Sequence, residues 1–268
     1  MTRALATLLI VVGLATQAQA WPASLLQCLL RDARRAVPRS LGRLLLDREE
    51  RVIEETRQVP LELSRALAQD LQAGRLQPET LAALEAHAGG ALDLIRQRRV
   101  GDGLVRLGGL ARIPADLADP VLSAGPEGLA PGVAREYSAF VEANLDKIPV
   151  VLDDPAALEL GRSGLAGYWQ GLLTRSRAQA PVIGSGMLHN GRAINHSLID
   201  FRSPVFGVAS LSYSRAVTAI AATWLALWRE VKGDLTARPE PLVLAPRDGA
   251  QDPLARATPR PALEARRP

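Results

Sequence analysis

Apolar residues recur every three or four positions along most of the chain, which is the spacing of one face of an α-helix. The clearest case is the segment 208–231, which we expect to be the central helix of a helical core. Its apolar face consists of Val217, Ile220, Ala221, Trp224, Leu227, Trp228 and Val231. The other expected helices cover residues 21–36, 40–58, 61–73, 78–95, 102–121, 132–147 and 155–178.

Proline, glycine and polar capping residues mark where several of these helices begin and end. Ser40 is placed to cap the second helix, and Pro60 stops it. Gly74 suits the left-handed position that follows the third helix, and Pro78 suits the first turn of the fourth. Pro114 should kink the fifth helix, because proline lacks an amide donor and crowds the carbonyl one turn earlier.

Three stretches break the helical pattern. Residues 123–131 are rich in glycine and proline and predict a loop. Within 181–206, the dipeptide Asn190-Gly191 is typical of a tight β-hairpin turn. Residues 233–268 are rich in proline, lack aromatic residues and predict a disordered tail. The sequence therefore predicts an all-α fold, with one helical domain over 21–232 that carries a short β-hairpin insertion.

Residues 1–20 have the features of a secretory signal peptide. A basic start is followed by an apolar stretch over 4–14 and by Ala18-Gln19-Ala20, which fits the small-x-small cleavage rule. The apolar stretch is shorter than the roughly 20 residues of a spanning helix, so cleavage is favoured over an uncleaved anchor. The mature chain is then expected to begin at Trp21, to be periplasmic or secreted, and to lack a transmembrane segment, since the uncharged run 216–228 is also too short.

The composition excludes several classes of protein. The chain is 47% hydrophobic and 22% charged, which is typical of a globular protein. Its net charge of +4 is too small for a protein that coats nucleic acid, and 4% aromatic residues are few for stacking on single strands. With three histidines and one cysteine, the supply of metal ligands and nucleophiles is small. Cys28 has no disulfide partner in the chain and is expected to pack as a small hydrophobic residue.

The segment 112–122 carries a spaced motif in which Asp116 is followed four residues later by Pro120. Together with Trp21 at the expected mature terminus and a closing helix that contains two tryptophans, this segment resembles the zinc-dependent phospholipase C and single-strand nuclease superfamily. The family motif is His-x-x-x-Asp-x-x-(Gln)-Pro-x-His. Here Arg112 and Leu122 stand where that motif has its two histidines. The resemblance covers residues 21–232 in architecture.

The resemblance implies an exported all-α scaffold for the hydrolysis of phosphodiester or phospholipid bonds. In that family the terminal tryptophan and the motif aspartate bind zinc, a role that would fall to Trp21 and Asp116. A histidine is also expected five residues after the tryptophan, where this chain has Leu26. Trp21 and Asp116 alone are too few ligands for a catalytic zinc cluster. The sequence therefore predicts a degenerate zinc site and favours the absence of a cofactor.

Arg112 and Asp116 allow a second interpretation that needs no metal. They lie four residues apart, so on a helix their side chains face each other. The guanidinium then supplies the positive charge that zinc would otherwise provide. We expect an ion pair near Trp21 in preference to a retained metal ligand, and an exposed surface pair is the remaining alternative.

Three further residues are candidates for binding. His87 borders the apolar stripe of its helix, and a hydrogen bond to a carbonyl is favoured over a role as a ligand. Asp200 and Arg202 lie in the irregular segment 195–206, and loops on a rigid frame often carry binding sites. A helix expected to begin at Gly207 would help Arg202 bind an anion. The alternative is that Asp200 and Arg202 pair and brace the loop.

Three functions remain open at this stage. The first is a non-catalytic exported protein that uses the scaffold to bind an unidentified ligand or envelope protein. The second is a phosphodiester or phospholipid hydrolase with a reduced zinc site. The third is an envelope structural or assembly factor whose tail reaches a partner.

Overall fold

The computed structural model describes residues 21–125, 128–236 and 243–244. The expected signal peptide lies outside these residues, as does most of the expected disordered tail. The described residues are mostly helical, which confirms the all-α prediction. The strands are two-residue segments.

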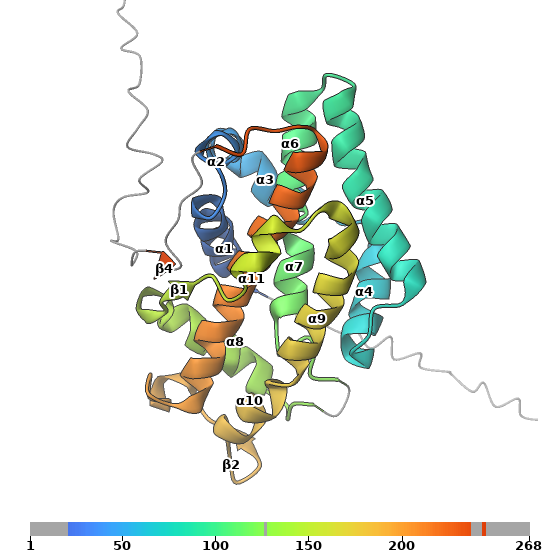
Figure 1. Cartoon of the computed structure of the whole chain (residues 1–268). Coiled ribbons are helices and arrows are strands. Elements are labelled where there is room, and N and C mark those ends of the chain that lie inside the picture. Colours follow the sequence, from blue (N-terminus) through green and yellow to red (C-terminus); the bar gives the residue numbers. More distant parts are fainter. Residues whose placement is uncertain (1–20, 126–127, 237–242, 245–268) are drawn as a thin grey trace, which may run out of the picture.

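The elements follow one another along the chain in the order drawn in Figure 1. The α-helices are α1 (Ala23–Arg35), α2 (Arg39–Leu46), α3 (Glu49–Glu55), α4 (Leu61–Ala73), α5 (Pro78–Arg96), α6 (Val100–Gly109), α7 (Arg112–Ala118), α8 (Val133–Ala143), α9 (Leu165–Arg177), α10 (Ala180–Gly186) and α11 (Pro204–Glu230). Short 3-10 helices are η1 (Leu145–Lys147), η2 (Pro155–Glu159), η3 (Arg162–Gly164) and η4 (His196–Leu198). The strands are β1 (Val150–Val151), β2 (Leu188–His189), β3 (Arg192–Ala193) and β4 (Val243–Leu244).

Helix α11 is the central element of the core, as its apolar pattern predicts. It contacts α1, α7, α9 and α10, and Figure 1 shows it passing between them. Within the described ranges it is also the one helix long and apolar enough to cross a membrane, and 72% of its most apolar window is buried inside the protein. Such burial is expected of a helix that is hydrophobic on all sides because other helices surround it.

Several boundaries follow the local chemistry of the sequence. Helix α4 ends where Gly74 adopts a left-handed φ of 74°, a conformation that glycine tolerates best. Helix α5 begins at Pro78. Strands β2 and β3 pair antiparallel around Asn190 and Gly191, both of which have positive φ angles (49° and 74°). These angles are those of the hairpin turn that Asn-Gly favours.

Four expected helices are divided in the structure, of which 155–178 forms η2, η3 and α9, and 132–147 forms α8 and η1. The segment 40–58 forms α2 and α3, and the bend places Val52 against Gly108 of α6, where a side-chain Cβ would lie 2.7 Å from the Val52 methyl carbons. Ser40 does not cap α2, which begins one residue earlier after Pro38. The segment 102–121 is divided rather than kinked, and α7 restarts at Arg112. Pro114 then falls in the first turn of α7, where its missing amide donor costs least.

Two further features differ from the expected boundaries. Helix α11 begins at Pro204, with the Ser203 side chain as its cap, and so starts before Gly207. Part of the expected tail returns to the domain, where β4 pairs antiparallel with β1.

Candidate functional site

Helix α7 carries the predicted ion pair between Arg112 and Asp116. The Nε of Arg112 donates to both carboxylate oxygens of Asp116, at 2.7 Å to Oδ1 and 2.8 Å to Oδ2. The Arg112 side chain is 23% exposed and that of Asp116 13% exposed. The pair is therefore mostly buried, and the alternative of an exposed surface pair is wrong.

Asp119 follows directly after α7 and adds a second buried carboxyl group. Its Oδ1 accepts a hydrogen bond of 2.8 Å from the amide of Val121. Burial raises the pKa of Asp119 to about 7, and the charge of Asp116 contributes to the increase. Burial also raises the pKa of Asp116, although Arg112 opposes it. Of these two buried carboxyl groups, Asp116 contacts the guanidinium and Asp119 does not, and Asp119 exchanges its proton near neutral pH.

Tyr137 of α8 is the third buried titratable group at this place. Burial raises the pKa of its phenol above the ordinary range, and the charge of Asp119 adds to the shift. The phenol therefore stays protonated at physiological pH and does not act as a base.

Trp21 lies against the same turn of α7, as predicted. Pro120 has no amide donor, so the Asp116 carbonyl accepts instead from the amide of Asp119 at 3.2 Å. The Ala115 carbonyl consequently lacks its usual helical partner, and the Trp21 indole N–H donates to it at 2.8 Å. Pro120, four residues after Asp116, thus leaves the Ala115 carbonyl free to accept from the Trp21 indole.

The Trp21 ring is also fixed by α11 and, through α11, by α1. It packs edge to face on Tyr213, with ring centroids 6.4 Å apart. The Tyr213 hydroxyl donates to Oδ2 of Asp32 at 2.9 Å, and Asp32 is fully buried. Trp21 therefore ties the start of the described chain to α1, α7 and α11.

The residues around Asp116 do not fit a zinc ion. A dication there would lie beside the Arg112 guanidinium, which already contacts both carboxylate oxygens. Leu26 is buried and Leu122 is partly buried, and neither side chain can ligate a metal. Over the described part of the chain, no group of three or more histidine, cysteine, aspartate or glutamate side chains is arranged to hold a metal.

Comparisons with known proteins were made at three levels. The chain matches no family model, no curated protein and no solved structure. The family resemblance consequently depends on the residues of this chain alone.

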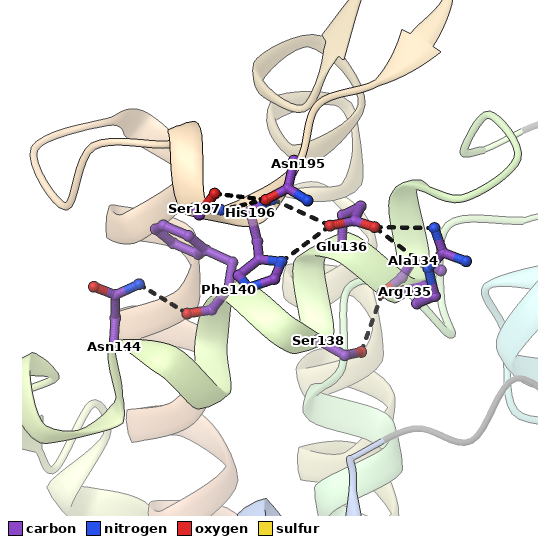
Figure 2. Close-up of polar contacts among 9 residues, drawn as sticks. All are labelled: Ala134, Arg135, Glu136, Ser138, Phe140, Asn144, Asn195, His196 and Ser197. Carbon is purple, nitrogen blue, oxygen red and sulfur yellow. Dashed lines mark hydrogen bonds and ion pairs between the residues drawn. The ribbon is translucent and has the colours of Figure 1, made fainter.

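A second polar cluster, which the sequence does not predict, joins α8 to the segment before α11 (Figure 2). Glu136 Oε2 contacts Nδ1 of His196 at 3.0 Å and accepts from the His196 backbone amide at 3.1 Å. Its Oε1 accepts from the guanidinium of Arg135 at 3.0 Å. Hydrogen bonds from His196 and then from Arg135 lower the pKa of Glu136 to about 2. This carboxylate remains ionised and fixes one end of the segment 195–203.

The same segment contains the predicted candidates Asp200 and Arg202. Among the described residues no ion pair joins their side chains; instead Asp200 Oδ1 accepts from the backbone amide of Arg202 at 2.8 Å. The guanidinium of Arg202 lies over the ring of Phe201, 5.5 Å from its centroid. The alternative that the side chains of Asp200 and Arg202 pair with each other is therefore wrong. Asp200 closes the turn by accepting from the backbone amide of Arg202.

His87 lies at a third place and is not brought to either cluster. Its Nδ1 lies 2.9 Å from the guanidinium of Arg106, which also contacts Glu55 at 3.1 Å. Burial, and then the charge of Arg106, lower the pKa of His87 to about 4. The imidazole is therefore neutral and accepts from Arg106 through Nδ1, in place of the expected hydrogen bond to a carbonyl.

The structure also has a surface hollow of about 570 Å³ between the α4–α5 connection and α9. None of the predicted candidate residues line it. Its lining consists of Gly74, Arg75, Leu76, Pro78, Leu81, Ala166, Gly167 and Gln170.

Proposed function

We propose that this protein is an exported, non-catalytic binding protein on a scaffold of the zinc-dependent phospholipase C and nuclease type. The helical fold is consistent with that scaffold. The spacing of Asp116 and Pro120 and the contact of Trp21 with α7 support the same assignment. The leader-like segment 1–20 supports export to the periplasm or beyond.

The observation that carries the proposal is the contact of Arg112 with both oxygens of Asp116. In the resembled family this aspartate bridges metal ions. Here a side chain of the protein itself supplies a permanent positive charge at that position, because arginine does not lose its proton at physiological pH. The arrangement compensates the buried carboxylate without zinc, and it puts a fixed positive charge beside the oxygens that a Lewis acid would have to bind.

Metal analysis of the exported protein tests the proposal. We expect N-terminal sequencing to start at Trp21, elemental analysis to find no stoichiometric zinc, and bis-p-nitrophenyl phosphate to remain intact in the presence of added zinc. The variant Arg112→His restores one family histidine but should not restore hydrolysis, because Leu26 and Leu122 still replace two others. Stoichiometric zinc together with chelator-sensitive hydrolysis by the wild-type protein would overturn the proposal in favour of a working hydrolase.

A further inference from the structure

The segment between β3 and α11 exposes two large apolar side chains to solvent. Leu198 is 78% exposed and Phe201 is 48% exposed, and they lie three residues apart. Both side chains thus project from the same short stretch of chain. We refer to Leu198 and Phe201 together as the apolar tip.

The apolar tip is held by a rigid framework. At the N-terminal end of the segment, His196 contacts Glu136. Next to it, Asn195 Oδ1 accepts from the amide and the hydroxyl of Ser197 at 3.0 and 2.7 Å. At its other end the Ser203 side chain caps α11. Such extensive bonding indicates that the exposure of the two apolar residues is a fixed property of the fold.

Aromatic packing ties the tip to the core as well. Phe201 packs edge to face on Phe206 of α11, with centroids 6.4 Å apart, and Phe206 packs in the same way on Phe140 of α8 at 6.5 Å. Phe140 is fully buried. The Phe201 ring therefore packs on Phe206, which in turn packs on the buried Phe140, while Phe201 itself remains partly exposed to solvent.

Cationic groups flank the exposed ring. Lys147 Nζ lies 5.6 Å from the centroid of Phe201, and the guanidinium of Arg202 lies 5.5 Å from it. Next to these cations in the chain are Asp200, whose carboxylate accepts from a backbone amide, and the exposed Asp146 of η1. An aromatic ring and a leucine with lysine and arginine beside them are typical of segments that bind at the interface of an anionic bilayer.

We infer that the apolar tip, with Lys147 and Arg202, docks the protein on the surface of an anionic lipid bilayer. Leu198 and Phe201 enter the interfacial region, where their apolar surface leaves water. The two cations contact lipid phosphates, and the His196–Glu136 contact holds the loop in the docking orientation. This inference deepens the proposed function and rests on it for the export that brings the loop to a membrane surface.

Vesicle binding by the purified mature chain tests the inference. We expect co-sedimentation with vesicles of phosphatidylglycerol and phosphatidylethanolamine, and at least tenfold weaker partitioning to vesicles of phosphatidylcholine alone. The double variant Leu198→Ser/Phe201→Ser should lose at least tenfold in partitioning to the anionic vesicles. Lys147→Gln and Arg202→Gln should each lose about fivefold.

A matched control is provided by Leu61, a leucine that is 57% exposed at the start of α4. Leu61→Ser should bind anionic vesicles as the wild-type protein does. Quenching by brominated lipids supplies a second measurement, because the quenching of Phe201→Trp in excess of that of the wild-type protein, which has four tryptophans of its own, reports insertion at the tip.

Three results would overturn the inference: no binding of the wild-type protein to anionic vesicles, equal binding to phosphatidylcholine, or unchanged binding by the double variant. Self-association that the double variant abolishes, without vesicle binding, would instead assign the tip to a protein interface. Zinc content measured on the same sample keeps the two proposals separate, since stoichiometric zinc contradicts the proposed function whether or not vesicles bind.

Discussion

Removing the guanidinium of Arg112 should destabilise the fold more than removing an exposed arginine. In Arg112→Ala, Asp116 loses the group that contacts both of its oxygens. The side chain of Asp116 is 13% exposed, so water replaces the lost partner poorly. Asp119 adds a further source of repulsion nearby.

The expected loss in the free energy of unfolding lies between the values for exposed and for fully buried ion pairs. Exposed ion pairs contribute about 0–1 kcal/mol, and removal of one partner from a fully buried pair costs about 3–5 kcal/mol. Because Arg112 retains 23% exposure and Asp116 can take up a proton, we expect a loss of about 1–3 kcal/mol. The loss should become smaller as the pH falls, because burial raises the pKa of Asp116 and protonation removes the uncompensated charge.

Urea unfolding followed by helical circular dichroism measures this effect. Arg57→Ala is a matched control, since the pair of Arg57 with Glu54 is more than half exposed on both sides and should contribute little. Asp116→Asn combined with Arg112→Ala should recover part of the stability, because the double variant carries no unpaired charge. A loss no larger than that of Arg57→Ala, or strictly additive single effects, would refute the reasoning.

Three further predictions concern neighbouring groups. The pKa of Asp119 in the folded protein is raised to about 7, so between pH 4 and pH 7 the folded state binds a proton that the unfolded state lacks. The free energy of unfolding should therefore fall by on the order of 4 kcal/mol from pH 4 to pH 7. Asp119→Asn should remove that fall, and an unchanged pH profile in this variant would contradict the assignment. Trp21→Phe keeps an aromatic ring but removes the indole N–H and part of a buried side chain, which leaves the Ala115 carbonyl without its donor. It should cost about 1–3 kcal/mol in urea unfolding, and wild-type stability would show that the hydrogen bond is dispensable. The pKa of Glu136 is lowered to about 2, so its contribution is present above pH 4.5 and is lost as the pH falls toward 2; Glu136→Gln should flatten the acid limb of a melting-temperature profile, whereas the exposed control Glu62→Gln should leave it steep.

Local chemistry explains which parts of the fold were predictable. Gly74, Pro78 and the Asn190-Gly191 turn act on the backbone within a few residues, and the structure confirms each of them. The divisions of 40–58 and 102–121 depend on contacts with other helices, such as the close approach of Val52 to Gly108. Apolar periodicity does not contain that information, because both halves of each divided segment keep the same pattern.

The candidate site was predictable to a similar extent. The pair of Arg112 and Asp116 follows from a spacing of four residues, whereas Glu136 and His196 are 60 residues apart in the chain. One signal pointed to Glu136: on its helix it shares a face with Phe140, and a carboxylate on an apolar face requires a partner. The sequence could not identify that partner, because it lies in an irregular segment whose path is set by tertiary contacts.

The buried aspartates of the described core differ in how their charge is compensated. Asp32 is satisfied by the Tyr213 hydroxyl at 2.9 Å and by Arg35 at 3.4 Å, and Asp116 by Arg112. Asp119 has the Val121 amide but no guanidinium in direct contact, and its pKa of about 7 means that a proton neutralises it for part of the time. A proton, unlike an arginine, is lost as the pH rises. The free energy of unfolding should therefore fall as the pH rises through the pKa of Asp119, and Asp116, whose pKa burial also raises, should act in the same direction.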